Sequence, residues 1–224
     1  MRAYRSRCFG KLHIPENGGV IFASNHLGLL DAAVLGAASP RPLHFLAKSE
    51  LFDSPLGPLL RAGGQIPIHE HSPSRVALRD SVAILRQGSA VAIFPEGQRG
   101  RGDVARIRHG VAYLALMAGV PVVPVAILGT RATGAGRESL PPLGSIVYIG
   151  FGEPLMFDLH PKPYRRAELA RAGELIRQRM SDHVRHAVAR TGQALPSDDV
   201  ARESRADSAH ETPSQSRSHR RPKP

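Results

Sequence analysis

The sequence predicts an α/β fold with a central, mostly parallel sheet flanked by helices. Three continuous apolar runs, at residues 20–24, 90–94 and 120–128, are typical of strands buried on both faces of a parallel sheet. The segments between them carry helical periodicity, and glycine or proline separates one element from the next. Alternation of buried strands with helices is the pattern of this fold class.

Proline and glycine delimit the elements of the first half of the chain. Pro40 and Pro42 end a helix that begins near Leu29, because proline cannot continue a helix. Ser72 followed by a proline is an N-cap signature, and Gly88 suits the turn after the end of the same helix. The expected buried strands of this half lie at residues 20–24, 43–47 and 90–94, after a short strand and turn within 10–17. The expected helices lie at residues 29–38, 56–61 and 73–87.

The second half adds a helix and two strands. A helix over residues 106–118 ends at Gly119, a residue type that suits the position just after a helix. The apolar run at residues 120–128 contains Pro121 and Pro124, which favour an edge strand or irregular pairing because proline donates no backbone hydrogen bond. The fifth long strand is expected at residues 145–151.

One domain and a tail account for the chain. Residues 1–190 form the domain, which ends in an amphipathic helix over 165–190 that we expect to pack on the sheet in preference to lying on a membrane. Residues 191–224 are polar with few hydrophobic side chains, so we expect a disordered tail. No run of about 18 apolar residues is present, and no transmembrane helix is expected.

Net charge and cysteine content restrict the classes of function. The formal net charge is +11, of which residues 191–224 supply only +1, from six basic and five acidic side chains. A body this basic favours an anionic partner, which nucleic acid, anionic lipid headgroups and phosphate-bearing substrates all provide. The single cysteine, Cys8, excludes an internal disulfide and favours a reducing, cytosolic setting. No metal is expected, because the histidines lack a coherent ligand spacing with carboxylates.

A histidine and an aspartate follow the first long strand. His26 and Asp31 are five residues apart, which on a continuous helix would place them about 140° apart around the axis. If His26 lies in the loop after the strand and Asp31 in the first turn of the helix, the chain can fold back and let the carboxylate accept from Nδ1–H. Nε2 is then free to act as a general base. The alternative from spacing alone is a structural histidine beside a helix-favouring acid.

Three sequence blocks change that balance. The first is Asn25-His26 followed by Asp31, an Asn-His-x4-Asp pattern. The second is Phe-Pro-Glu-Gly-Gln-Arg at residues 94–99, and the third is the proline-containing strand that starts at Val120. In this order the blocks resemble the lysophosphatidic-acid-acyltransferase-like family of glycerolipid acyltransferases, whose second block is Phe-Pro-Glu-Gly-Thr-Arg. The resemblance covers roughly residues 11–157 and implies that family's α/β fold.

The resemblance implies a catalytic dyad and an oxyanion site. His26 is the expected general base for the acceptor hydroxyl, and Asp31 orients its ring, so no acyl-enzyme is required. Asn25, or backbone N–H groups near Gly28 or Gly97, are the expected donors to the tetrahedral oxyanion.

The resemblance also implies contacts to the substrates. Arg99 matches a residue used around the acceptor, and its fork suits a phosphate or headgroup. Glu96 would orient Arg99 or the acceptor hydroxyls, with Gly97 beside it. Lys48, in a stretch that resembles the family's Lys-x-Glu-Leu-Phe, is a further candidate for a substrate phosphate. A surface salt bridge is the structural alternative for Glu96 and Arg99.

The implied reaction is transfer of a fatty acyl group from acyl-CoA or acyl carrier protein to the hydroxyl of a lysophospholipid. The default acceptor is 1-acylglycerol 3-phosphate, which gives phosphatidic acid, and no cofactor is implied. Glu70 stands where the family has an arginine associated with the acceptor's phosphate, so a different hydroxylated lipid stays open as the acceptor. The implied location is peripheral, on an anionic membrane surface at the cytoplasmic face of the cell membrane.

Two other functions compete with this interpretation. A thioester hydrolase would use the same dyad on water, although the chain has no Gly-x-Ser-x-Gly nucleophile elbow. A nucleic-acid-binding protein would explain the positive charge. The chain lacks tryptophan, a zinc pattern and a recognisable basic helix, so nucleic acid is not the expected partner.

Overall fold

The computed structural model describes residues 4–68, 75–158 and 165–197. Within these ranges seven strands form one sheet in the order β1-β7-β6-β2-β5-β3-β4. Every neighbouring pair is parallel except β6 and β7, which are antiparallel. The strands are β1 (Arg5–Phe9), β2 (Val20–Ser24), β3 (Leu43–Lys48), β4 (Ile66–Ile68), β5 (Ala90–Ile93), β6 (Val122–Leu128) and β7 (Ile146–Phe151). The predicted α/β class with a mostly parallel central sheet is confirmed.

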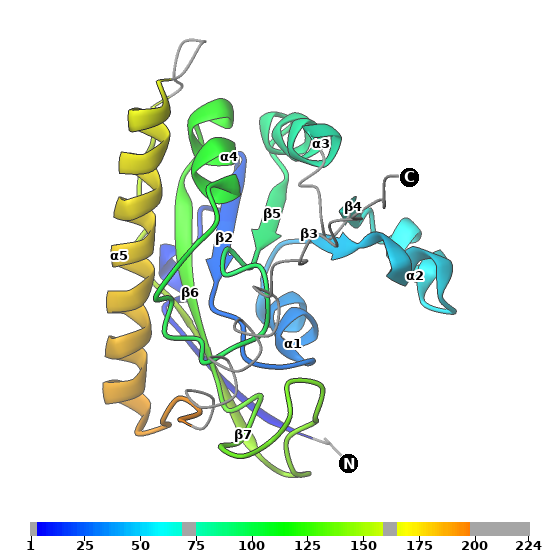
Figure 1. Ribbon diagram of the computed structural model, residues 1–224, viewed down its shortest axis with the longest axis vertical. Helices are drawn as coiled ribbons and strands as arrows, with labels where there is room; N and C mark the ends of the chain where they lie inside the picture. The colour runs from blue at the N-terminus through cyan, green and yellow to red at the C-terminus, as the bar shows by residue number, and fades with distance from the viewer. Residues whose placement is uncertain (1–3, 69–74, 159–164, 198–224) are drawn as a thin grey trace, which may run out of the picture.

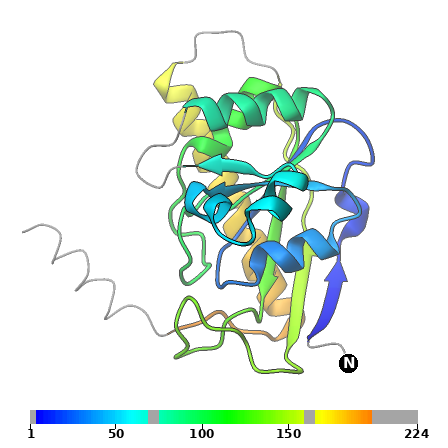
Figure 2. The same cartoon turned by 90° about the vertical axis from the view of Figure 1, so that its right-hand side faces the viewer.

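Helices cover both faces of the sheet, but unequally. The helices α3, α4 and α5 cover one face, and α1 lies on the other, as Figures 1 and 2 show together. The short helix α2 extends from the β3–β4 edge. Their bounds are α1 (Asp31–Ala38), α2 (Gly57–Ala62), α3 (Arg75–Arg86), α4 (Gly110–Ala118) and α5 (Arg166–Thr191), with 3-10 turns η1 (Lys11–His13) and η2 (Ser49–Asp53).

Side chains that alternate along the central strand β2 belong to two hydrophobic cores, one on each face of the sheet. Ile21 and Ala23 pack with α3, α4 and α5, whereas Val20 and Phe22 pack on the α1 side. All five residues of β2 are buried, as expected for a central strand covered on both faces. Because β2 is held between β5 and β6, its carboxyl end is a rigid base for the residues that follow.

The amino-terminal strand lies earlier than the sequence predicts. The strand is Arg5–Phe9, whereas residues 11–13 of the segment expected to hold it form the turn η1. The strand Arg5–Phe9 is mostly exposed at the edge of the sheet and has no continuous apolar run, so its sequence carries no signal of burial.

Of the two alternatives that its prolines favour, the strand at residues 120–128 shows irregular pairing and not an edge position. Strand β6 lies inside the sheet, between β2 and β7. Pro124 is accommodated because the ladder with β7 begins at Val125, so the missing N–H lies where that pairing ends. The carbonyl of Pro124 still accepts from Gly152 N–H at 2.8 Å.

The strand at residues 43–48 is less buried than expected. Only Leu43 is buried among its residues. It pairs with β5 on one side and with the three-residue strand β4 on the other, close to the edge of the sheet. The helix expected from residue 106 begins at Gly110, because residues 105–108 form an irregular connection in which Arg108 N–H donates to the Pro95 carbonyl.

The long helix α5 packs on the sheet, as predicted. The buried residues of this helix are Ala172, Gly173, Ile176, Met180, Val184 and Ala187. Leu195, beyond the helix, also packs against this core. The sequence predicts a disordered tail over residues 191–224, but Thr191 is still part of α5 and residues 192–197 are described. Residues 198–224 lie outside the described residues, as do Ser72 and Glu70. No helix in the described ranges is long and apolar enough to cross a bilayer.

Candidate active site

Four parallel strands bring three predicted site residues and a fourth polar residue, Thr130, to one edge of the sheet. His26 follows β2, Glu96 follows β5, Lys48 ends β3 and Thr130 follows β6. These strands run in the same direction, so their carboxyl ends meet at a common edge. In open α/β sheets this is the edge at which ligands bind.

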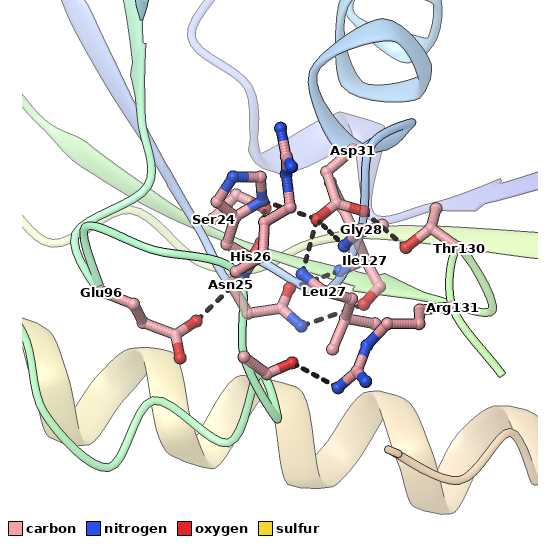
Figure 3. Close-up of polar contacts among 12 residues, drawn as sticks. Ser24, Asn25, His26, Leu27, Gly28, Asp31, Glu96, Ile127, Thr130 and Arg131 are labelled. Carbon is pink, nitrogen blue, oxygen red and sulfur yellow. Dashed lines mark hydrogen bonds and ion pairs between the residues drawn. The ribbon is translucent and has the colours of Figure 1, made fainter. Parts of the chain in front are cut away.

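His26 and Asp31 are in direct contact, which their spacing allows if the chain folds back after the strand. Nδ1 of His26 lies 2.7 Å from Oδ2 of Asp31, and the side chains are 17% and 0% exposed respectively. Asp31 is the first residue of α1, and the four residues before it turn the chain back toward the histidine (Figure 3). With Nδ1 bound to the carboxylate, Nε2 is the ring nitrogen available for chemistry.

The Asp31 carboxylate is held by four donors. Besides His26, Oδ2 accepts from the backbone N–H groups of Leu27 at 2.6 Å and Gly28 at 2.9 Å. Oδ1 accepts from the hydroxyl of Thr130 (Figure 3). Because an ionised carboxylate accepts on both oxygens, this arrangement suits a buried negative charge facing the imidazole.

An aromatic ring fixes the plane of the imidazole. The rings of His26 and Phe94 are stacked with centroids 4.1 Å apart and an angle of 18° between their planes. Phe45 stacks on Phe94 in turn, at 6.4 Å. The histidine is therefore held at its edge by a carboxylate and on its face by a ring.

The loop after β5 is hydrogen-bonded to the main chain of His26 on both sides. Glu96 Oε1 accepts from His26 N–H at 2.9 Å, and Gly100 N–H donates to the His26 carbonyl at 2.9 Å. Gly97 has φ 77° in this loop, and a Cβ there would lie 2.4 Å from Arg108 Nε. The loop that carries Glu96, Gly97 and Arg99 is thus attached to the histidine on both sides.

Asn25 has a structural position. Its side chain is fully buried, its Nδ2 donates to the Ile127 carbonyl at 3.0 Å, and its Oδ1 accepts from Ile127 N–H at 2.7 Å. These bonds continue the β2–β6 pairing beyond the last ladder residue, so the amide aligns the strand end that carries His26. The Asn25 side chain, which the sequence predicts to contact a substrate, is thus bonded to the main chain and has no exposed surface in this structure.

The two backbone donors expected for an oxyanion are already engaged. Gly28 N–H donates to Asp31, and Gly97 N–H donates to the Phe94 carbonyl at 3.0 Å. Neither bond follows from the local sequence pattern, because both depend on how the loops turn.

The two basic candidates differ in their surroundings. Arg99 forms an ion pair with Glu138, and its side chain is 26% exposed. Lys48 is exposed at the carboxyl end of β3, two strands from His26. In the described part of the chain, no three His, Cys, Asp or Glu side chains are grouped so that they could hold a metal ion.

Sequence reasoning misses Thr130 and Arg131. Arg131 is 3% exposed and donates to the carbonyls of Gly100 at 2.9 Å and Ala135 at 3.0 Å. It thereby ties the loop after β6 to the loop after β5 (Figure 3). These two residues could have been found from their position directly after an apolar strand, because polar residues there lie at the carboxyl edge of the sheet.

Comparisons with known proteins identify relatives of the chain. A family model described as Acyltransferase matches residues 5–128. The chain is 30% identical over 179 residues to the 1-acyl-sn-glycerol-3-phosphate acyltransferase of Bacillus subtilis, which covers 79% of this chain and 86% of that protein. It is also 30% identical over 126 residues to the protein of the same name in Borreliella burgdorferi, covering 54% of this chain and 50% of that one.

A solved structure shares the fold. The crystal structure of the 1-acyl-sn-glycerophosphate (LPA) acyltransferase PlsC from Thermotoga maritima superposes with a TM-score of 0.64 and 24% sequence identity. The match covers 83% of this chain and 73% of that chain.

Proposed function

The chain belongs to the acyltransferase family and is an enzyme of that class, and from this we propose that it acylates the hydroxyl of a lysophospholipid. The donor in this proposal is acyl-CoA or acyl carrier protein. The favoured acceptor is 1-acylglycerol 3-phosphate, giving phosphatidic acid, and the name of the Bacillus subtilis relative supports that choice. A different hydroxylated lipid is the second candidate acceptor, because Glu70 reverses a charge near which a phosphate is expected.

The observation that carries the proposal is the buried Asp31 held against Nδ1 of a partly exposed, ring-stacked His26. In the proposed reaction Nε2 takes the proton of the acceptor hydroxyl while its oxygen attacks the thioester carbonyl. The tetrahedral intermediate then expels the thiolate, and the imidazolium returns the proton to sulfur. Asp31 stabilises the imidazolium between these steps.

The proposal gives the remaining candidates supporting roles. Arg99 binds a substrate phosphate, for which its planar fork is suited. Glu96 and Gly97 hold the loop that presents Arg99, since Glu96 binds the main chain of His26. Lys48 binds a more distant substrate phosphate. Residues 1–190 form the acyltransferase domain in this proposal, and the chain acts peripherally on an anionic membrane surface at the cytoplasmic face.

The first test is thiol release from palmitoyl-CoA by wild type and His26→Ala, with and without 1-acylglycerol 3-phosphate. A positioned general base typically contributes about 10²- to 10⁴-fold, so we expect a rate loss equivalent to about 3 to 5 kcal/mol of barrier. His186→Ala is the matched control, because His186 is exposed on α5 and outside the site.

The other outcomes separate the alternatives. Thiol release that needs His26 but no acceptor would identify a thioester hydrolase. Release that needs a different lipid would keep the mechanism and change the acceptor. If His26→Ala and wild type release thiol equally with every acceptor, the catalytic assignment fails.

A further inference from the structure

The partner of Arg99 is a carboxylate on a neighbouring loop. Arg99 is 26% exposed, whereas Glu138, with which its Nη1 forms an ion pair, is 77% exposed. Nε of Arg99 is buried and has no hydrogen-bond partner among the described residues. The Arg99 guanidinium is thus mostly buried, whereas the Glu138 carboxylate that pairs with it is mostly exposed to solvent.

The loop that supplies Glu138 connects β6 to β7 and is anchored at its base. Arg131 donates to the carbonyl of Gly100, the residue after Arg99, and to the carbonyl of Ala135 in its own loop. Beyond that anchor the Glu138 region is held by short turns, in which Ala135 N–H and Ser139 N–H each donate three residues back. The loop therefore has a fixed base beside Arg99 and a locally held tip.

Arg99 belongs to the loop that is attached to the main chain of His26. In sequence it stands between Glu96 and Gly100, which bind the N–H and the carbonyl of His26 respectively. An anion bound by Arg99 would lie at the same edge of the sheet as the imidazole.

We propose that Glu138 is a specificity-determining residue that occupies Arg99 until the phosphate of a substrate displaces it. This inference rests on the proposed function, in which Arg99 binds a substrate phosphate. A phosphate monoester carries nearly two negative charges and three acceptor oxygens, so it competes well with one carboxylate for the guanidinium. A neutral lipid offers nothing in exchange for Glu138 and leaves the ion pair in place.

The strength of an exposed ion pair sets the size of the effect. Such pairs contribute little in water, so displacement of Glu138 should weaken phosphate binding by no more than about fivefold. Glu138 thus weakens the binding of phosphate-bearing substrates slightly and does not affect neutral ones. It changes the KM of phosphate-bearing substrates more than kcat.

The test compares Glu138→Gln with wild type on two acceptors, 1-acylglycerol 3-phosphate and the neutral 1-acylglycerol. We expect KM for the phosphate-bearing acceptor to fall about two- to fivefold, with kcat and the KM for the neutral acceptor unchanged. In an Arg99→Ala background the Glu138→Gln effect should disappear, since the two residues act as a pair.

Glu153→Gln is the matched control. Glu153 is exposed, and the same net charge is removed. It lies at the opposite edge of the sheet, since its neighbours Gly152 and Leu155 pair with Pro124 and Val122 near the amino end of β6. This variant should leave both KM values unchanged.

The outcomes distinguish the source of the phosphate and the failure of each proposal. A fall in the KM of acyl-CoA alone assigns the displaced contact to the donor's phosphates. Binding of glycerol 3-phosphate, measured by calorimetry, does not depend on turnover and should be about two- to fivefold tighter in Glu138→Gln. Equal affinity and equal KM values in both proteins would overturn the inference. Tighter binding without any acyl transfer by wild type would instead overturn the proposed function.

Discussion

The orientation of His26 depends on residues that never touch its ring. Asp31 holds Nδ1, but Asp31 is itself positioned by Leu27, Gly28 and Thr130. Two of these donors come from the turn that the aspartate closes, whereas Thr130 reaches in from the end of β6. The Asp31 carboxylate is therefore held by donors from its own turn and by one long-range donor, Thr130.

Replacing Thr130 with valine should lower kcat without removing activity. The change keeps the shape of the side chain but leaves Oδ1 of the buried Asp31 without its hydroxyl donor. Loss of a hydrogen bond to a charged group costs about 1.5 to 3 kcal/mol, so we expect kcat to fall about 10- to 100-fold.

Thr130→Ser retains the hydroxyl and should recover most of the activity. The pH dependence of kcat adds a readout that altered packing alone would not move, because a less restrained Asp31 changes how the His26 imidazolium is stabilised. Equal kcat values and pH profiles in Thr130→Val and wild type would show that the contact has no positioning role.

The sequence predicts the part of the site that is local. The spacing of His26 and Asp31 permits the contact that the structure contains, and the family resemblance of the sequence blocks around them is what favours it. The hydroxyl of Thr130 and the guanidinium of Arg131 are beyond such reasoning, because they meet their partners across 99 and 31 residues of sequence respectively. The engagement of Gly28 and Gly97 N–H groups depends on loop conformation, which residue type alone does not specify.

At the scale of elements, apolar runs predict where strands lie in the sequence, but they do not predict which strands are neighbours in the sheet. The strand at residues 20–24 has the predicted bounds, because burial on both faces leaves a continuous apolar run. Strand β6 has the same signal, yet Pro124 within it and Pro121 just before it favour an edge or irregular pairing. Strand β6 can lie inside the sheet because its ladder with β7 begins at Val125, just after Pro124. Where that ladder begins is a property of the whole fold.

The packing of α5 on the sheet makes Ile176 a test of that interface. Its side chain is fully buried in the core shared with α4 and the sheet. Ile176→Ala should lower the free energy of unfolding by about 2 to 5 kcal/mol through lost burial and a cavity.

Leu175→Ala is the control on the same helix. Leu175 is 46% exposed, so the loss should stay below about 1 kcal/mol. Urea denaturation of both variants measures the difference. Equal losses would mean that α5 does not bury the side that its contacts indicate.

The helix α5 also contributes a titratable contact. Nε2 of His183 lies 2.9 Å from the Gly150 carbonyl of β7. Burial lowers the pKa of His183, and the nearby His13 and His186 lower it further, although the bond to Gly150 opposes them. The folded protein thus binds the proton less readily than the unfolded chain, where a histidine has a pKa of about 6.5.

Stability should therefore fall on acidification. Below about pH 6.5 the unfolded chain gains a proton at this position that the folded protein resists, so the free energy of unfolding decreases down to the lowered pKa. His183→Gln should flatten this decline when urea denaturation is compared at pH 7.5 and 5.5. The exposed His186→Gln should retain it, and an equally steep decline in His183→Gln would contradict the assignment.

At the scale of the whole molecule, the net charge of +11 governs long-range attraction. The protein should sediment with vesicles containing anionic lipid, and sedimentation should decrease as salt rises from about 0.05 to 0.5 M because exposed charges are screened. Vesicles of zwitterionic lipid are the control. Equal sedimentation with both vesicle types at all salt concentrations would show that charge does not drive the contact.

The pairing of the first strand with the last has a consequence for synthesis. Arg5 of β1 is aligned with Ile146 of β7, 141 residues later in the chain. At ribosomal rates of about 5 to 20 residues per second, Arg5 is added to the chain roughly 7 to 28 s before Ile146. Because β7 is the sole neighbour of β1 in the described sheet, β1 cannot pair until β7 has been translated, although β1 is made much earlier.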